Sequence, residues 1–155
     1  MWMSDKVPVQ QELAGTLSNL IHSFTSPTDA LLYLETFLKT MKREWPGIDR
    51  WRIDKYYSLI RRMVREALEY VRGTDYDPQA LAAFSEAVGD CTVRRPNGVR
   101  FHLADLFVSE LARSCPDVSS QAAQMLLMPF YSVLLNTDDR AMFHKTVKAV
   151  MRPLM

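Results

Sequence analysis

Residues 47–72 read GIDRWRIDKYYSLIRRMVREALEYVR and show the clearest helical pattern in the chain. At about 100° per residue, one arc of this stretch is almost entirely apolar. Such an arc is typical of a helix that packs one face on a core and leaves the opposite face charged. We therefore expect a long helix from Asp49 to about Arg72, ended by Gly73. The residues of the apolar arc are Ile53, Tyr56, Ile60, Met63, Val64 and Ala67.

The same period continues on both sides of this stretch, and most of its breaks carry residues that start or stop helices. Ser26-Pro27 and Asp77-Pro78 suit helix starts, whereas Pro46-Gly47 and Pro116 suit helix ends. No stretch alternates with the period of a strand. The first helix is expected to bury one stripe made of Leu13, Leu17, Leu20, Ile21 and Phe24. Helices are expected over about 8–24, 27–45, 49–72, 78–88, 99–114 and 119–135, and from about 137 onward, with a loop over 89–98.

The helix order predicts the fold class. Helix hairpins would begin near Pro8, Asp49 and Val99, a spacing close to the roughly 40–47 residues of HEAT-type repeats. We predict an all-α protein, a right-handed stack of antiparallel helix hairpins (a HEAT-like α-solenoid) with about seven helices. A compact helical bundle is the alternative. Residues 1–155 are expected to form a single helical-repeat domain.

Composition narrows the class of protein. The 155 residues are 48% hydrophobic with a formal net charge of +1, which fits a globular domain with a real core and excludes a disordered chain. Cys91 and Cys115 are too few for a disulfide framework and too far apart for a zinc site, which favours a reducing compartment. The longest apolar run, 125–135, is shorter than the ~20 residues of a membrane helix. We expect a soluble, intracellular protein.

The near-neutral total charge conceals two basic zones on an acidic body. Between Asp49 and Arg72 there are seven basic and four acidic residues. The expected loop from Cys91 to Arg100 adds Arg94, Arg95 and Arg100 without an acid. A negatively charged partner would therefore be attracted by these two basic zones and not by the net charge of the chain.

A stripe of polar residues lies opposite the apolar arc of the long helix. It consists of Trp51, Lys55, Ser58 and Arg62. Cations beside an exposed tryptophan suit phosphates with a stacked base, or the acidic surface of a protein. Alternatively, Trp51 packs under a neighbouring helix and the charges pair locally, as Asp54 with Arg61 or Arg62 with Glu66. The candidate RNA- or partner-binding residues are Arg50, Trp51, Arg52, Lys55, Arg61, Arg62, Arg65, Arg94, Arg95 and Arg100.

Catalysis has a single weak candidate in the sequence. His102 and Asp105 lie three positions apart on one helix face and could hydrogen-bond, as in a small helical enzyme or ligand-binding domain. No glycine-rich phosphate loop, nucleophile elbow or carboxylate cluster accompanies them. We therefore expect no enzyme, no catalytic or metal-binding residues and no cofactor.

Three motifs resemble a known family. They are Met1-Trp2-Met3-Ser4-Asp5-Lys6, Glu44-Trp45-x-Gly47-Ile48-Asp49-Arg50 and Asn97-Gly98-x-Arg100-x-His102-x-Ala104-Asp105. Together they resemble the conserved domain of the nucleolar ribosomal RNA-processing protein one family, also called nucleolar protein 52. The resemblance implies a helical, repeat-like domain located in the nucleus, in the nucleolus. It also implies a non-enzymatic assembly factor of the large ribosomal subunit that is required for processing of precursor rRNA.

The partners implied are the precursor large-subunit particle, its pre-rRNA and other assembly factors, with no membrane and no small-molecule substrate. Two readings of the basic stripe stay open: direct contact with RNA, or a protein–protein scaffold without RNA contact. The chain departs from the family pattern at both ends. The tryptophan-containing opening is not preceded by further sequence, and the basic C-terminal tail is missing, so a fragment lacking these parts is one expectation.

Overall fold

The computed structural model describes residues 7–93 and 97–155, and within these ranges it is built from helices without a strand. Short 3₁₀ helices follow the first and second α-helices at Leu20–Ser23 and Trp45–Gly47. A π-helical segment, Val147–Met151, and a 3₁₀ turn, Arg152–Leu154, follow the last α-helix. The α-helices are α1 (Val7–Asn19), α2 (Pro27–Glu44), α3 (Ile53–Gly73), α4 (Pro78–Val93), α5 (Asn97–Ser114), α6 (Ser120–Asn136) and α7 (Arg140–Thr146).

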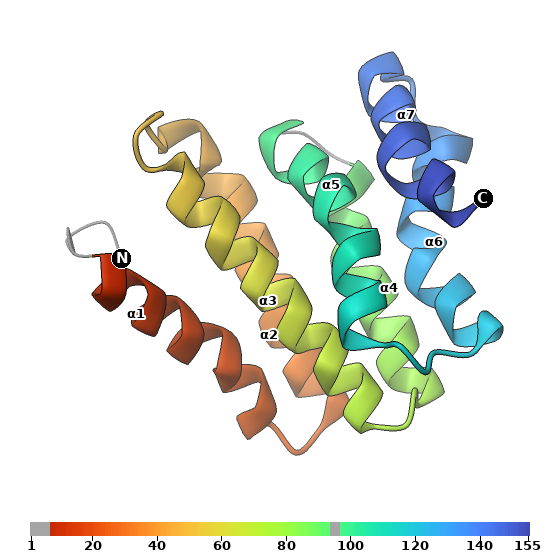
Figure 1. The fold of residues 1–155 in the computed structure, drawn as a ribbon, viewed down its shortest axis with the longest axis horizontal. Coiled ribbons are helices and arrows are strands. Elements are labelled where there is room, and N and C mark those ends of the chain that lie inside the picture. Colours follow the sequence, from red (N-terminus) through yellow and green to blue (C-terminus); the bar gives the residue numbers. More distant parts are fainter. Residues whose placement is uncertain (1–6, 94–96) are drawn as a thin grey trace.

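The helices form two layers (Figure 1). In the front layer of this view α1 packs on α3, α3 on α5, and α5 on α7 and the π segment. Behind them, α2 packs on α4 and α4 on α6. Within each layer every helix thus contacts the next helix of that layer, which is the arrangement of a helical-repeat stack. The predicted all-α stack of about seven helices is confirmed.

The core lies between the layers. The apolar face predicted for 49–72 is buried in α3, where Ile60, Met63 and Val64 have no exposed surface. Three buried phenylalanines join successive helices: the ring centroids of Phe84 and Phe107 are 6.1 Å apart, and those of Phe107 and Phe130 are 4.7 Å apart. Burying such a side chain stabilises the fold by about 1.5–3 kcal/mol. The aromatic contacts therefore join α4, α5 and α6.

The first helix does not bury the stripe that the sequence predicted. Of that stripe only Ile21 is buried, while Leu20 and Phe24 are exposed. The residues that α1 buries instead are Gln10, Ala14 and Ser18. The small side chains of Ala14 and Ser18 allow two helices to approach closely. Contact with α3 therefore selects the small-residue face, and the leucine-rich face is left at the rim.

The expected loop over 89–98 is also mostly helix. The α4 helix continues to Val93 and α5 begins at Asn97, so only residues 94–96 separate them. Gly89 lies inside α4, where a glycine weakens a helix without ending it. Arg94 and Arg95 fall between these helices, outside the described residues. None of the helices in the described ranges combines the length and the hydropathy that crossing a bilayer requires.

Candidate nucleic-acid interface

Trp51 lies in the turn between α2 and α3, and 89% of its surface is exposed. The turn is fixed by Asp49, whose Oδ1 atom accepts hydrogen bonds from the backbone N–H groups of Trp51 and Arg52, both at 3.1 Å. The Nε atom of Arg52 also lies 2.8 Å from Asp49 Oδ2. This turn leaves Trp51 and the neighbouring Arg50 in solvent. An exposed indole is the kind of group that stacks on a base or another ring.

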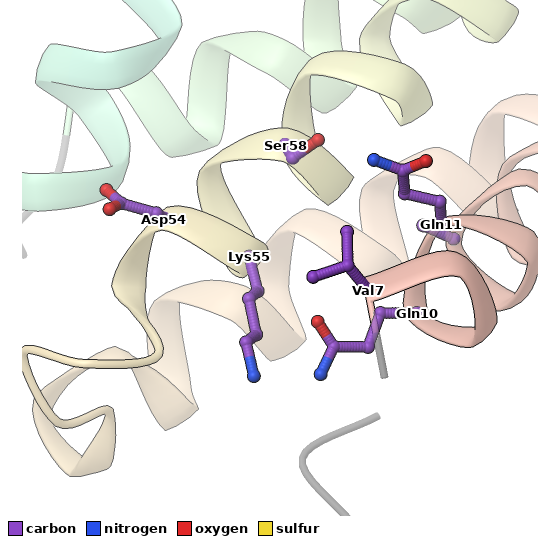
Figure 2. A pocket seen from close by; sticks show the side chains of 7 residues that line it. Val7, Gln10, Gln11, Asp54, Lys55 and Ser58 are labelled. Atoms are coloured by element: carbon purple, nitrogen blue, oxygen red, sulfur yellow. The ribbon is translucent and has the colours of Figure 1, made fainter. Parts of the chain in front are cut away.

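Lys55 and Ser58 line a hollow between the first turns of α1 and α3. The hollow has a volume of about 220 Å³. Figure 2 shows the Lys55 side chain extending alongside Val7 and Gln10 of α1. The cation therefore sits at an opening whose walls are partly apolar. The other residues that line it are Val7, Gln10, Gln11, Ala14 and Asp54.

Arg62 continues this line one turn further along the helix, after Ser58. Its Nη1 atom would lie 3.6 Å from a Cβ atom placed on Gly15, so its side chain passes close to α1. Within the described residues Arg62 makes no ion pair, and the expected pair with Glu66 is not formed. Glu66 instead bonds to His22, with 2.9 Å between Oε2 and the imidazole Nε2. Arg62 is therefore a cation without an acidic partner among the described residues.

Arg61 and Arg65 are engaged inside the stack. Arg61 Nη1 donates to Oε1 of Glu110 at 2.7 Å, and Arg65 Nε donates to Oε2 of the same residue at 2.8 Å. The expected pairing of Asp54 with Arg61 is therefore replaced by a contact between α3 and α5. Burial raises the pKa of Glu110, but the bonds from Arg65 and Arg61 outweigh it and leave the pKa below its ordinary value. The bond to Glu110 also raises the pKa of Arg65.

Arg100 lies away from the stripe. Only 2% of its surface is exposed, and its guanidinium pairs with Asp139 in the turn before α7. The hydrogen bonds from the backbone of Met142 and the bond from Arg100 are among the causes that lower the pKa of Asp139. A guanidinium buried in this way offers little surface to an external partner. Of the ten candidate residues the structure thus leaves Arg50 and Trp51 exposed, and Lys55 and Arg62 half-buried, along one edge that we call the α3 basic surface.

His102 and Asp105 do not form the expected hydrogen bond. The His102 Nε2–H group donates to the backbone carbonyl of Tyr57 at 2.9 Å, and the two rings pack with centroids 4.2 Å apart. Burial lowers the pKa of His102 below its ordinary value. Asp105 pairs with Lys145 of α7 instead. Each residue therefore joins α5 to a different helix. In the part of the chain that the structure describes, His, Cys, Asp and Glu side chains do not gather in a group that could hold a metal ion.

Two of the motifs quoted above meet each other in the fold. The Trp45 indole lies against Gly98, where an added Cβ atom would overlap the ring. The same indole packs on Tyr57 with ring centroids 5.2 Å apart. Together with the bonds of Arg100 and His102, these contacts hold α5 against α2, α3 and the turn before α7. The motif residues that the structure describes therefore fix the junctions between helices.

The sequence patterns did not single out a second group of exposed cations, which lies on the last helix. Arg140, Lys148 and Arg152 are exposed, and no acidic residue follows Asp139 in the sequence. The absence of acidic residues after Asp139 could have identified this group from the sequence. The group was missed because its charges are spread over a stretch that otherwise resembles an ordinary amphipathic helix.

The chain matches the family model described as Nucleolar protein, Nop52 over residues 1–154. It is 30% identical over 160 residues to the human Ribosomal RNA processing protein 1 homolog B, and 33% identical over the same length to the homolog from Drosophila melanogaster. The mouse homolog A is 31% identical. These alignments cover the whole of this chain but only 21%, 23% and 32% of the respective relatives.

The family description names no enzymatic activity. It does name the nucleolus, which confirms the nuclear and nucleolar location expected from the resemblance. The alignments to several ribosomal RNA processing proteins span the full chain. The chain belongs to the Nop52 family of nucleolar proteins.

Proposed function

We propose that this chain is a non-enzymatic factor in assembly of the large ribosomal subunit, required for processing of precursor rRNA, and that its α3 basic surface binds pre-rRNA. The names of its relatives, which are ribosomal RNA processing proteins, support the process. The observation that carries the RNA contact is an indole 89% exposed beside cations that have no ion-pair partner among the described residues.

The proposed contact has a simple physical form. Arg50, Lys55 and Arg62 neutralise phosphates, and Trp51 stacks on an unpaired base. Phosphate contacts fix the position of the protein on the RNA but carry little sequence information. The helical stack then acts as a rigid support that holds a precursor RNA segment in place. The chemistry of cutting or joining the RNA is left to other components of the particle.

A second candidate function is a protein–protein scaffold that uses the same edge. The observation in its favour is the hollow beside Lys55, whose walls include Val7 and Ala14. Helical repeats commonly bind proteins, and an acidic segment with an apolar residue would fit this opening. In that case RNA affinity would be unaffected by changes in the α3 basic surface.

The test is a binding titration of the full chain against an RNA hairpin of mixed sequence. The variant Arg50→Gln/Lys55→Gln/Arg62→Gln removes three cations that lie outside the buried core. If each contacts a phosphate, the slope of log K against log[NaCl] falls by about 2–3, and affinity at low salt falls by about tenfold or more. The separate variant Trp51→Ala weakens binding about 5- to 150-fold if the indole stacks on a base.

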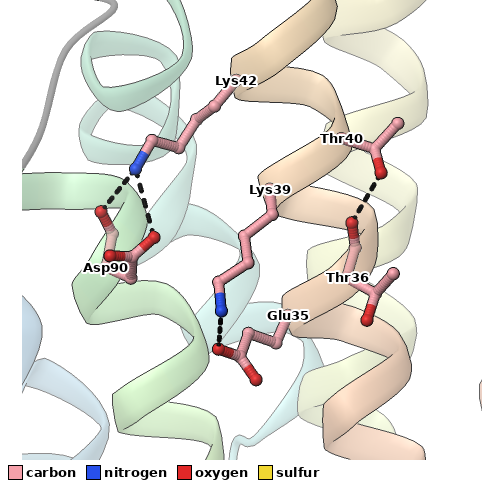
Figure 3. Close-up of polar contacts among 6 residues, drawn as sticks. All are labelled: Glu35, Thr36, Lys39, Thr40, Lys42 and Asp90. Carbon is pink, nitrogen blue, oxygen red and sulfur yellow. Dashed lines mark hydrogen bonds and ion pairs between the residues drawn. The ribbon is translucent and has the colours of Figure 1, made fainter.

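A matched control is Lys39→Gln/Arg43→Gln/Arg113→Gln, which changes the net charge equally. Figure 3 shows that Lys39 bonds to Glu35 on the back layer. Arg43 pairs with Glu44, so these two cations already have acidic partners. Arg113 is an exposed cation in the last turn of α5. The control should leave the salt slope unchanged. Equal slopes for the two triple variants would rule out RNA contact by the α3 basic surface. Loss of binding to a polyglutamate peptide in the first variant would then favour the scaffold.

A further inference from the structure

The charged residues of the last helical segment, residues 140–155, are all basic. Residues 140–155 contain Arg140, Lys145, Lys148 and Arg152 and no acidic residue. Lys145 is neutralised by Asp105 of α5. The other three are exposed, and among the described residues they form no ion pair. Like charges that form no ion pair repel one another unless a partner supplies negative charge.

These cations share one face of the segment. The exposed positions Arg140, His144, Lys148 and Arg152 recur at every fourth residue. The buried positions also recur at every fourth residue, offset by two: they are Met142, Thr146 and Val150. We call the four exposed residues the C-terminal stripe.

The π-helical segment explains how a four-residue repeat stays on one face. In a regular α-helix, a step of four residues turns by about 40° beyond a full turn, so such a row drifts around the helix. A π turn is wider, since its hydrogen bonds run from residue i to i+5. The segment Val147–Met151 is π-helical and opposes the drift. The local widening thus keeps Lys148 and Arg152 in line with Arg140.

An exposed aromatic ring accompanies the stripe. Phe143 is 40% exposed, and its ring meets that of His144 edge-on with centroids 5.9 Å apart. The α3 basic surface has the same combination of an exposed ring and cations without an acidic partner. A solvated cap at the end of a repeat stack needs a polar face, but charges of either sign satisfy that need. The need for a polar face therefore does not explain why the row contains only cations and has an exposed aromatic ring beside it.

Phosphates fit this row better than an acidic protein does. Helical rise places Lys148 and Arg152 about 6 Å apart, and Arg140 about 12 Å from Lys148 with His144 between them, so one strand of a nucleic acid backbone can follow the row. Protein interfaces, in contrast, place charged residues at the rim around an apolar centre. The centre of the C-terminal stripe consists of His144 and Lys148.

We infer that the C-terminal stripe is a second phosphate-binding surface, which contacts the backbone of an RNA helix separately from the α3 basic surface. The inference rests on the proposed function, because pre-rRNA is the RNA in question. In the front layer α3 and α7 lie on opposite sides of α5 (Figure 1). The two surfaces can therefore hold two RNA segments, or two parts of one fold, at a set spacing.

The test uses the full chain, the same RNA hairpin and the variant Arg140→Gln/Lys148→Gln/Arg152→Gln. Loss of three phosphate contacts lowers the slope of log K against log[NaCl] by about 2–3 and weakens binding about tenfold at low salt. The Lys39/Arg43/Arg113 variant again serves as the control of equal charge. When the changes in both basic surfaces are combined, the two losses in log K should add, because the sites are independent.

A second measurement needs no variant and so does not depend on folding. Lys148 of the wild-type chain is acetylated in solution with and without the RNA, and mass spectrometry compares its modification with that of Lys39. RNA should protect Lys148 several-fold and leave Lys39 unchanged. Equal modification of Lys148 in both samples would overturn the inference.

The outcomes separate this inference from the proposed function. If the C-terminal variant binds RNA like the control while the Arg50/Lys55/Arg62 variant is impaired, the second surface is wrong and the proposed function stands. If neither variant is impaired, both are wrong. If the C-terminal variant keeps RNA affinity but loses affinity for polyglutamate, the stripe serves an acidic protein and the inference is likewise overturned.

Discussion

Glu110 lies beneath two arginines of α3 and has only 2% of its side chain exposed. A carboxylate at such a depth is costly unless its charge is matched and hydrogen-bonded. Arg61 and Arg65 supply one bond to each of its oxygens. These arginines are among the predicted binding residues, but in the fold they stabilise the junction between α3 and α5.

We predict that Glu110→Gln lowers the free energy of unfolding by about 2–3 kcal/mol. The amide cannot match two guanidinium groups, although their partial exposure to water limits the cost. Urea denaturation followed by circular dichroism measures the change. Glu86→Gln, an exposed site on α4, is the control and should change stability by less than about 0.5 kcal/mol. Equal midpoints for the two variants would show that Glu110 contributes nothing specific.

Glu110 should also contribute to the loss of stability at acidic pH. Its pKa is lower in the folded chain than in the unfolded chain, so its contribution is complete above the unfolded pKa and is lost as the pH falls through the folded pKa. The melting temperature of the wild type should therefore drop below about pH 5. The drop should be shallower in Glu110→Gln, but not absent, because the pKa values of Asp117 and Asp139 are lowered too. Parallel curves for the two proteins would contradict this account.

At the residue scale, the sequence predicted which side chains are charged and exposed better than it predicted their partners. Trp51 lies in solvent as its place on the polar face suggested. The two pairs proposed from helical spacing did not form, because Arg61 bonds to Glu110 and Glu66 bonds to His22, each partner more than 40 positions away. Spacing along one helix reports only neighbours on that helix. Contacts between helices depend on how the layers pack.

At the scale of elements, the spacing of apolar residues and the capping residues predicted well where helices occur. The start of α2 after Ser26 and the end of α5 before Pro116 lie close to where the sequence placed them. Two features had no visible signal. The π-helical segment has no distinguishing residue type, and the face that α1 buries was decided by the fit to α3. Periodicity identifies an apolar face, but packing decides which face is covered.

Two glycine-to-alanine substitutions test whether the contact at the start of α5 is too tight for a side chain. Gly98→Ala should destabilise the protein by about 1–3 kcal/mol, because its Cβ atom would overlap the Trp45 indole and force α2 and α5 apart. Gly89→Ala is the matched change inside α4, where an added Cβ meets no atom within 4 Å. It should stabilise the protein by about 0.5–1 kcal/mol through helix propensity. Thermal melts of both variants decide the matter, and a stable Gly98→Ala protein would contradict the tight contact.

At the scale of the whole molecule, the stack should not open uniformly. Front-layer helices α3 and α5 each have a neighbour on both sides, whereas α1 and α7 have a neighbour on one side only within the described chain. We predict that native-state hydrogen exchange is at least about tenfold slower in α3, α4 and α5 than in α1 and residues 140–154. Mass spectrometry of peptic fragments gives the rates. Equal protection along the chain would mean that the domain opens only as one unit.

Every front-layer junction contains a bond between a carboxylate and a basic side chain: His22 with Glu66, Arg61 and Arg65 with Glu110, and Lys145 with Asp105. In the back layer Lys42 reaches Asp90, but α6 has no acidic or basic side chain, so its contact with α4 contains no ion pair that salt could screen. Added salt weakens the ion pairs of the front layer and leaves the contact between α4 and α6 in the back layer unchanged. The bend of the stack should therefore respond to ionic strength, and with it the separation of its two cationic edges.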